Sequence, residues 1–197
     1  MMDQKLATAA RRLNARHPMA GLLPPLVLLT DRARLPDPLA AAERLPAGSL
    51  VILRDGDLAP EARLALGLAL ARLCRRQRLR LMVAGDPRLA RRVNAAGVHW
   101  PETRLPMRAS GFATAAAHGA RALARARRAG VAAVLLSPVF PTDSHPGAPC
   151  LGLMRFAGLA RRAGLPVYAL GGVDGRTAPR LAGSGVVGVA AIGALRP

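Results

Sequence analysis

VAAVLLSPVFPTDSHPGAPCLG, residues Val131–Gly152, is the stretch of this chain that decides the fold. It begins with an apolar run, Val131–Leu136, and continues as a long segment rich in proline, glycine and polar side chains. An apolar strand that ends in such a loop is typical of α/β proteins, whose ligand sites lie at the carboxyl ends of their strands. Loops longer than about a dozen residues usually have a function. The stretch therefore predicts a buried strand and a site-forming loop; the alternative is a rigid surface connection.

Similar apolar runs recur on both sides of this stretch. Together with Val131–Leu136, the runs are Leu26–Leu29, Leu50–Leu53, Leu79–Val83, Gly97–Trp100, Val167–Leu170 and Val186–Ile192, with a weaker one at Gly111–Ala116. Helical patterns separate them, at Pro38–Arg44, Pro60–Gln77, Pro87–Ala95, His118–Ala129, Leu153–Ala163 and Arg176–Ala182. Alternating strands and helices predict a parallel sheet, and eight strands in 197 residues favour a single small (β/α)8 TIM barrel over an open sheet.

The two ends of the chain depart from a regular barrel. Little sequence follows the last predicted strand, so we expect the eighth outer helix to be missing or very short. A basic amphipathic segment, Gln4–Arg16, precedes the first strand and is expected to form an extra helix that covers this gap or the barrel floor. We therefore expect a helical extension over residues 1–20 and one barrel domain over residues 21–197.

Composition limits the possible partners. The net charge of +18 is almost entirely arginine, with Lys5 the only lysine, and aromatic residues make up 3%. The arginines are spread over many helices without interleaved aromatics, so we expect solvated helix faces and no specific nucleic-acid binding. No apolar run is long enough to predict a membrane span. Cys74 and Cys150 lie in unrelated contexts, which favours a reduced, cytoplasmic location.

Polar residues and glycines gather where the strands are expected to end. In chain order these ends are Thr30-Asp31, Arg54-Asp55, Gly85-Asp86, His99 to Glu102, His118, Ser137, Gly171-Gly172 and Ile192-Gly193. Paired glycines allow backbone N–H groups to approach a phosphate closely. Small residues after the seventh and eighth strands of a barrel are a frequent phosphate site, so the sequence predicts that Gly171, Gly172, Ile192 and Gly193 bind a phosphate.

The same segments carry recognisable motifs. His118 stands twenty residues before Pro138, and S-P-V-F-P-T-D-S-H-P-G, V-Y-A-L-G-G-V and G-V-A-A-I-G-A-L follow in order. Together they resemble the thiamine phosphate synthase and TenI superfamily of small (β/α)8 proteins, which has G-P-[VI]-[FY]-x-T, V-x-A-[IL]-G-G and a small-residue ending at these places. Upstream, L-L-T-D at Leu28–Asp31, L-R-D at Leu53–Asp55 and G-V-H at Gly97–His99 resemble the family's first, second and fourth strands.

One activity implied by this resemblance is that of a synthase. Such an enzyme joins a pyrimidine diphosphate to a thiazole phosphate and uses Mg²⁺, which needs oxygen ligands. At the family's two metal-binding places this chain has Ala84-Gly85-Asp86 and Arg104, so Asp86 is the single remaining metal candidate. Where the family has a Gln and a Lys that bind the pyrimidine diphosphate, this chain has Ile52 and Gly56. Where the family has a lysine in the long loop, this chain has His145.

The other implied activity is that of a thiazole tautomerase of the TenI branch, which the turn H-W-P-E resembles. Its reaction removes and returns a proton, a task that suits histidine and needs no metal. The family's tautomerase histidine corresponds to His118, and His145 is a second acid/base candidate; the alternative for His118 is a backbone hydrogen bond at the start of a helix. Besides the four residues of the predicted phosphate site, we expect three more to contact the substrate: Arg54, Ser137 and Thr142.

Three hypotheses follow from the sequence. The favoured one is a TenI-like protein that binds thiazole phosphate and tautomerises it, with no cofactor. The alternatives are a divergent synthase with Mg²⁺ and a non-catalytic ligand-binding barrel. His99 and Trp100 are expected to pack in the barrel. A homodimer is the further hypothesis, because a partner could cover the strip left by the eighth helix.

Overall fold

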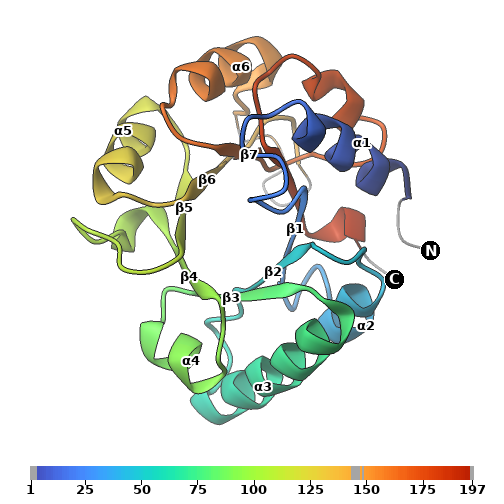
Figure 1. Ribbon diagram of the computed structural model, residues 1–197, viewed down its shortest axis with the longest axis vertical. Coiled ribbons are helices and arrows are strands. Elements are labelled where there is room, and N and C mark those ends of the chain that lie inside the picture. Colours follow the sequence, from blue (N-terminus) through green and yellow to red (C-terminus); the bar gives the residue numbers. More distant parts are fainter. Residues whose placement is uncertain (1–3, 143–146, 148, 196–197) are drawn as a thin grey trace.

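The computed structural model describes residues 4–142, 147 and 149–195, and its centre is a closed barrel of eight parallel strands in chain order (Figure 1). The strands are β1 (Leu26–Leu29), β2 (Leu50–Leu53), β3 (Arg80–Ala84), β4 (Gly97–Trp100), β5 (Ala113–Ala117), β6 (Ala133–Leu136), β7 (Val167–Ala169) and β8 (Gly188–Ala191). The barrel closes where β1 pairs with β8, with Val27 beside Ala190. The predicted small (β/α)8 fold is confirmed.

Helices surround the barrel (Figure 1). The α-helices are α1 (Gln4–Ala15), α2 (Pro38–Glu43), α3 (Pro60–Gln77), α4 (Pro87–Arg92), α5 (Ala120–Ala129) and α6 (Gly152–Arg162). Three short 3-10 helices complete the ring: η1 (Glu102–Arg104), η2 (Ala178–Leu181) and η3 (Gly193–Leu195). The helix predicted over Arg176–Ala182 is thus the brief η2, and η3 is the very short eighth helix expected after the last strand.

The strands form the core because they are apolar on both faces. All four residues of β1, β2, β6 and β8 are buried. This is the pattern of a parallel sheet covered by helices outside and filled by side chains inside. Large side chains such as Met82 and Tyr168 are almost fully buried, and the Tyr168 hydroxyl donates to Pro24 O at 2.7 Å.

Helix α1 covers the side of the barrel that lacks a long eighth helix. It lies against β8, β1 and η2, and Figure 1 shows it in the outer ring beside the last segments of the chain. Its apolar face, including Leu6, Ala10 and Leu13, is buried. Asn14 Nδ2 donates to Leu23 O at 3.1 Å and to Val187 O at 2.8 Å. These contacts place the helix over the gap and not over the barrel floor.

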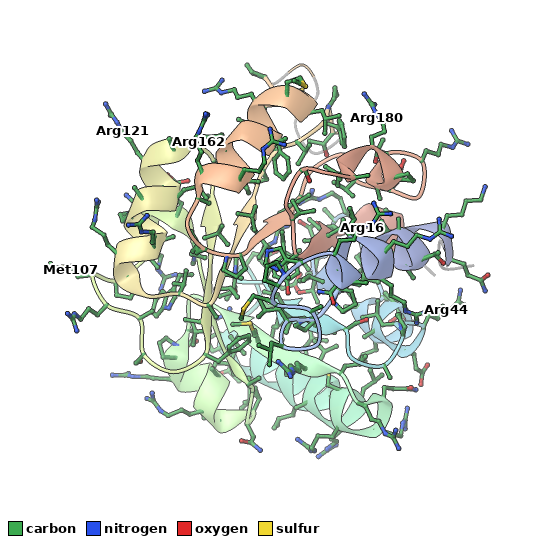
Figure 2. The ribbon with its side chains drawn as sticks, turned by 45° about the horizontal axis from the view of Figure 1, so that its top comes forward. Arg16, Arg44, Met107, Arg121, Arg162 and Arg180 are labelled. Atoms are coloured by element: carbon green, nitrogen blue, oxygen red, sulfur yellow. The ribbon has the colours of Figure 1, made fainter. Side chains whose placement is uncertain are left out.

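The arginines lie mainly on the outer helices, as the composition suggested. Figure 2 shows the side chains of Arg44, Arg121 and Arg180 projecting away from the barrel. Arg180 also lies over the ring of Phe140, 5.0 Å from its centroid. In the described part of the chain, no helix is both long and apolar enough to cross a membrane.

Candidate functional site

The carboxyl ends of all eight strands meet at one mouth of the barrel, since the strands are parallel. On one side of this mouth, the loop after β6 is fastened to the end of β7. Val139 N donates to Leu170 O at 3.0 Å, and Phe140 N donates to Gly171 O at 3.1 Å. The pairing of β6 with β7 therefore continues beyond the strands and holds the loop beside the glycine pair.

Gly171 and Gly172 make this approach possible. Both have positive φ angles, +91° and +65°. A Cβ atom on Gly171 would stand 2.7 Å from Pro138 Cβ, and one on Gly172 would stand 2.4 Å from Pro141 O. These distances leave no space for a side chain, so close packing of the loop is a structural reason for both glycines, beside the predicted phosphate contact.

The predicted substrate residues of this side follow three neighbouring strands. Ser137 comes directly after β6, Gly171-Gly172 comes after β7, and Ile192-Gly193 comes after β8, where Gly193 begins η3. Thr142 lies further along the β6 loop and is half-buried. His145 lies outside the described residues. The structure thus gathers these predicted residues, His145 apart, on one arc of the mouth formed by β6 to β8.

Arg54 lies on the opposite arc, at the end of β2, and is held by the end of β1. Its backbone N–H donates to Thr30 Oγ1 at 2.9 Å, and its guanidinium pairs with Asp31 Oδ2. Asp31 is also bound by Arg34, whose hydrogen bonds are the main reason that the pKa of this carboxyl lies below its usual range. Arg54 is therefore a fixed and partly exposed cation.

Asp55 has a structural part in the same arc. It is 4% exposed, accepts from the Thr30 hydroxyl, and accepts from Arg32 N at 2.8 Å. A buried carboxylate needs such partners. Asp55 therefore fixes the turn after β1, and its two oxygens are engaged within the protein.

Asp86, the metal candidate, lies at the end of β3 and is engaged in the same way. Its Oδ1 accepts from Leu89 N at 2.9 Å and thereby caps α4. Its Oδ2 lies 3.3 Å from Nη1 of Arg63. Arg104 Nη2 donates to the neighbouring Gly85 O at 2.8 Å. Asp86 is thus bound as a helix cap and arginine partner.

These donors do not fit a magnesium ion. Mg²⁺ needs several oxygen ligands that are free to coordinate it, whereas Asp31, Asp55 and Asp86 are each bound by arginine or backbone N–H groups. Within residues 4–142, 147 and 149–195, no group of three or more His, Cys, Asp or Glu side chains is suited to a metal ion.

His118, the predicted acid/base residue, follows β5 and pairs with Glu102 of η1. Its Nδ1 lies 2.7 Å from Glu102 Oε2, and its backbone N–H donates to the same oxygen at 3.0 Å. Arg125 Nη2 in turn donates to Glu102 O. The His118 side chain is 59% exposed. The hydrogen bond to the Glu102 carboxylate leaves Nε2 of His118 as the nitrogen available for proton transfer.

His99 belongs to the core, as expected. It is 4% exposed, and its Nδ1 lies 2.9 Å from Thr114 Oγ1. Burial lowers its pKa to about 4, so this imidazole is neutral near neutral pH. Trp100, the next residue, also packs against the core.

The fold and these strand-end residues define a small (β/α)8-barrel protein with a candidate small-molecule site at its mouth. This chain belongs to the thiamine monophosphate synthase family, whose model matches residues 26–195. It is 34% identical over 182 residues to a thiamine-phosphate synthase of Alcanivorax borkumensis, covering 86% of this chain and 84% of that protein. It is 33% identical over 183 residues to a putative thiamine-phosphate synthase of Geobacter sulfurreducens, covering 86% and 85%. The resemblance found in the sequence motifs is confirmed.

The solved structures agree on the fold. Thiamine phosphate pyrophosphorylase from Pyrococcus furiosus superposes with a TM-score of 0.73 at 23% identity, covering 85% of this chain and 84% of that one. At this identity the match supports the barrel architecture alone.

Proposed function

We propose that this protein acts in thiamine biosynthesis by joining a thiazole phosphate to a pyrimidine diphosphate, which yields thiamine phosphate. The departures of this chain from the synthase motifs, taken alone, favour a tautomerase. The curated relatives favour the synthase, because those from A. borkumensis and G. sulfurreducens carry that name and align with most of this chain. Family membership over residues 26–195 supports the pathway.

The chemistry of this reaction places two demands on the site. The thiazole nitrogen forms a C–N bond with the methylene carbon of the pyrimidine, while the C–O bond to the diphosphate breaks and the diphosphate leaves with the electron pair. The protein must hold both substrates in line and stabilise the charge of the leaving diphosphate.

The observation that carries the proposal is the division of the mouth into two arcs. The ends of β7 and β8, with Gly171, Gly172 and Gly193, offer backbone N–H groups to a monophosphate, and the end of β6 offers the Ser137 hydroxyl. The end of β2 offers the Arg54 guanidinium, held by Asp31, to a diphosphate. Since β2 and β6 stand on opposite sides of the barrel order, two phosphorylated substrates would enter from opposite arcs with their reacting ends at the centre.

The test is product formation. Wild-type protein is incubated with both substrates, with and without Mg²⁺, and thiamine phosphate is measured by chromatography. We expect product only when both substrates are present. Ser137→Ala should raise the KM for thiazole phosphate by about tenfold, the value of one hydrogen bond to a charged group. Folded wild-type protein that forms no thiamine phosphate under either condition would contradict the proposal.

A second candidate, tautomerisation of a carboxythiazole phosphate, is favoured by the pairing of His118 with Glu102 at 2.7 Å. A carboxylate that orients a histidine is a frequent arrangement for general acid/base catalysis. The reaction moves one proton within the substrate: His118 would accept it from carbon and return it at another atom. Isomerisation by wild type that is lost in His118→Ala would support this candidate with His118 as its acid/base residue. Isomerisation that survives the substitution would reject that role of His118, and folded wild type that does not isomerise the substrate would reject the candidate function.

A further inference from the structure

At the end of β3, two arginines from different elements hydrogen-bond to consecutive backbone carbonyls. Arg63 of α3 donates from Nη2 to Ala84 O at 2.8 Å, and Arg104 of η1 donates from Nη2 to Gly85 O at 2.8 Å. We infer that this pair supplies the positive charge for the diphosphate of the substrate, so that the protein binds a diphosphate without a divalent metal. This inference rests on the proposed synthase function, because that reaction has a diphosphate substrate.

Arg104 is built into the end of the strand. A Cβ on Gly85 would stand 3.1 Å from Arg104 Nη1, and Gly85 has a φ of +64°. A side chain at this position would press against the guanidinium and strain the backbone. The residue itself is exposed. One Nη group is thus used for anchoring, while the guanidinium keeps further N–H donors, since it has five in total.

Arg63 stands closer to the protein interior. Its side chain is 13% exposed, and its Nε is buried without a hydrogen-bond partner. Nη1 pairs with Asp86 Oδ2 at 3.3 Å, which is a long contact for an ion pair. This guanidinium is anchored through Nη2 to Ala84 O, and it faces the Asp86 carboxylate at this long distance, so its positive charge can also attract a second anion.

The charges at this place favour an anion over a cation. The Asp86 carboxylate is already used twice: it caps α4 and pairs with Arg63. A divalent cation would have to displace Arg63 and would face two guanidinium groups. A diphosphate would instead meet Arg63 and Arg104 here, with Arg54 at the end of the neighbouring strand β2. The planar fork of arginine matches phosphate oxygens.

The experiment uses inorganic pyrophosphate as the probe, titrated into the whole protein by calorimetry in EDTA. We expect saturable binding by wild type without metal. Added Mg²⁺ should leave this binding unchanged or weaken it, because it complexes the free pyrophosphate. Arg104→Gln should weaken binding by about tenfold, the usual effect of losing one charge-assisted contact.

Matched variants make the result specific. Arg108→Gln, which removes an exposed arginine from the same connection, should bind pyrophosphate as wild type does. Arg104→Lys keeps the charge but loses the fork, and should give an intermediate affinity. Circular dichroism checks that each variant is folded. Because Arg63 is largely buried, it is tested by the conservative Arg63→Lys, for which we expect weakened binding.

The outcomes separate this inference from the proposed function. Pyrophosphate binding that requires Mg²⁺, is absent in both conditions, or is unaffected by Arg104→Gln would overturn the inference. If pyrophosphate binding requires Mg²⁺ and thiamine phosphate nevertheless forms, the proposed function stands although the inference is overturned. Metal-independent binding that is weakened in Arg104→Gln supports the inference. If the wild type binds pyrophosphate in this way but forms no thiamine phosphate, the inference stands and the proposed synthase function is contradicted.

Discussion

Inside the barrel, His99 of β4 and Thr114 of β5 are hydrogen-bonded at 2.9 Å, and the Thr114 hydroxyl also contacts Met82 Sδ of β3 at 3.7 Å. This polar group is surrounded by apolar strands. Burial lowers the pKa of His99 to about 4, and the nearby Arg54 charge acts in the same direction. Protonation of His99 therefore opposes the folded state.

This predicts an acid-sensitive stability. The folded pKa of about 4 lies below the ordinary value of 6.5. The neutral His99 thus contributes stability that is fully present above pH 6.5 and is lost as the pH falls toward 4. The loss due to this group amounts to about 3 kcal/mol. Urea unfolding of wild type and His99→Asn across this range should show a steeper fall for wild type; parallel curves would contradict the assignment.

Single residues were predictable from the sequence only where a motif marks them. His118 and the glycine pair stand in family-like segments, so the sequence pointed to them. The partner of His118 could not be found in this way, because Glu102 reaches it through the pairing of β4 with β5, in which Trp100 stands beside Ala115. Arg63 lies in a helix whose arginines otherwise resemble a solvated face, and the sequence carries no signal that distinguishes it.

Among the elements, α1 has the least usual position. It precedes β1 in the chain and yet covers the side where β8 meets β1. The buried Asn14 amide connects it to the segments that lead into both strands, through Leu23 O before β1 and Val187 O before β8. A buried amide that bonds two backbone carbonyls fixes the helix more specifically than apolar contact does.

We therefore expect Asn14→Ala to destabilise the whole barrel. The substitution leaves two backbone carbonyls without this donor, which costs roughly 1–3 kcal/mol each when they stay buried. Thermal or urea unfolding measures the change. Arg11→Ala, on the exposed face of the same helix, is the matched control and should stay within about 0.5 kcal/mol of wild type. Equal effects of the two substitutions would show that α1 is not fastened through Asn14.

Most elements could be predicted from the sequence because their patterns are strong. Strands β1, β2 and β4 have the expected bounds. The Ala-rich β5 gives a weak signal; it begins two residues later and ends one residue later than predicted, since alanine says little about strand ends. The helix expected after β7 at Arg176–Ala182 is only the 3-10 helix η2, Ala178–Leu181, and α1 lies against it.

At the scale of the whole molecule, the barrel mouth has two chemically different arcs. Small residues and backbone groups dominate the ends of β6 to β8, whereas arginines paired with aspartates dominate the ends of β1 to β3. The net charge of +18 adds a general attraction for phosphorylated compounds. Both candidate reactions need a thiazole phosphate on the first arc, so binding of this compound is the claim that supports the whole account.

The most direct measurement is a calorimetric titration of thiazole phosphate into wild type, Gly172→Ala and Gly183→Ala. Both glycines have positive φ angles, +65° and +77°, but a Cβ on Gly172 meets Pro141 O at 2.4 Å, whereas one on Gly183 meets nothing within 4 Å. We predict saturable one-to-one binding by wild type and Gly183→Ala, and an affinity at least about tenfold lower for Gly172→Ala, since displacement of the β6 loop disrupts the arc. Absence of binding by folded wild type, or equal binding by all three proteins, would contradict the account.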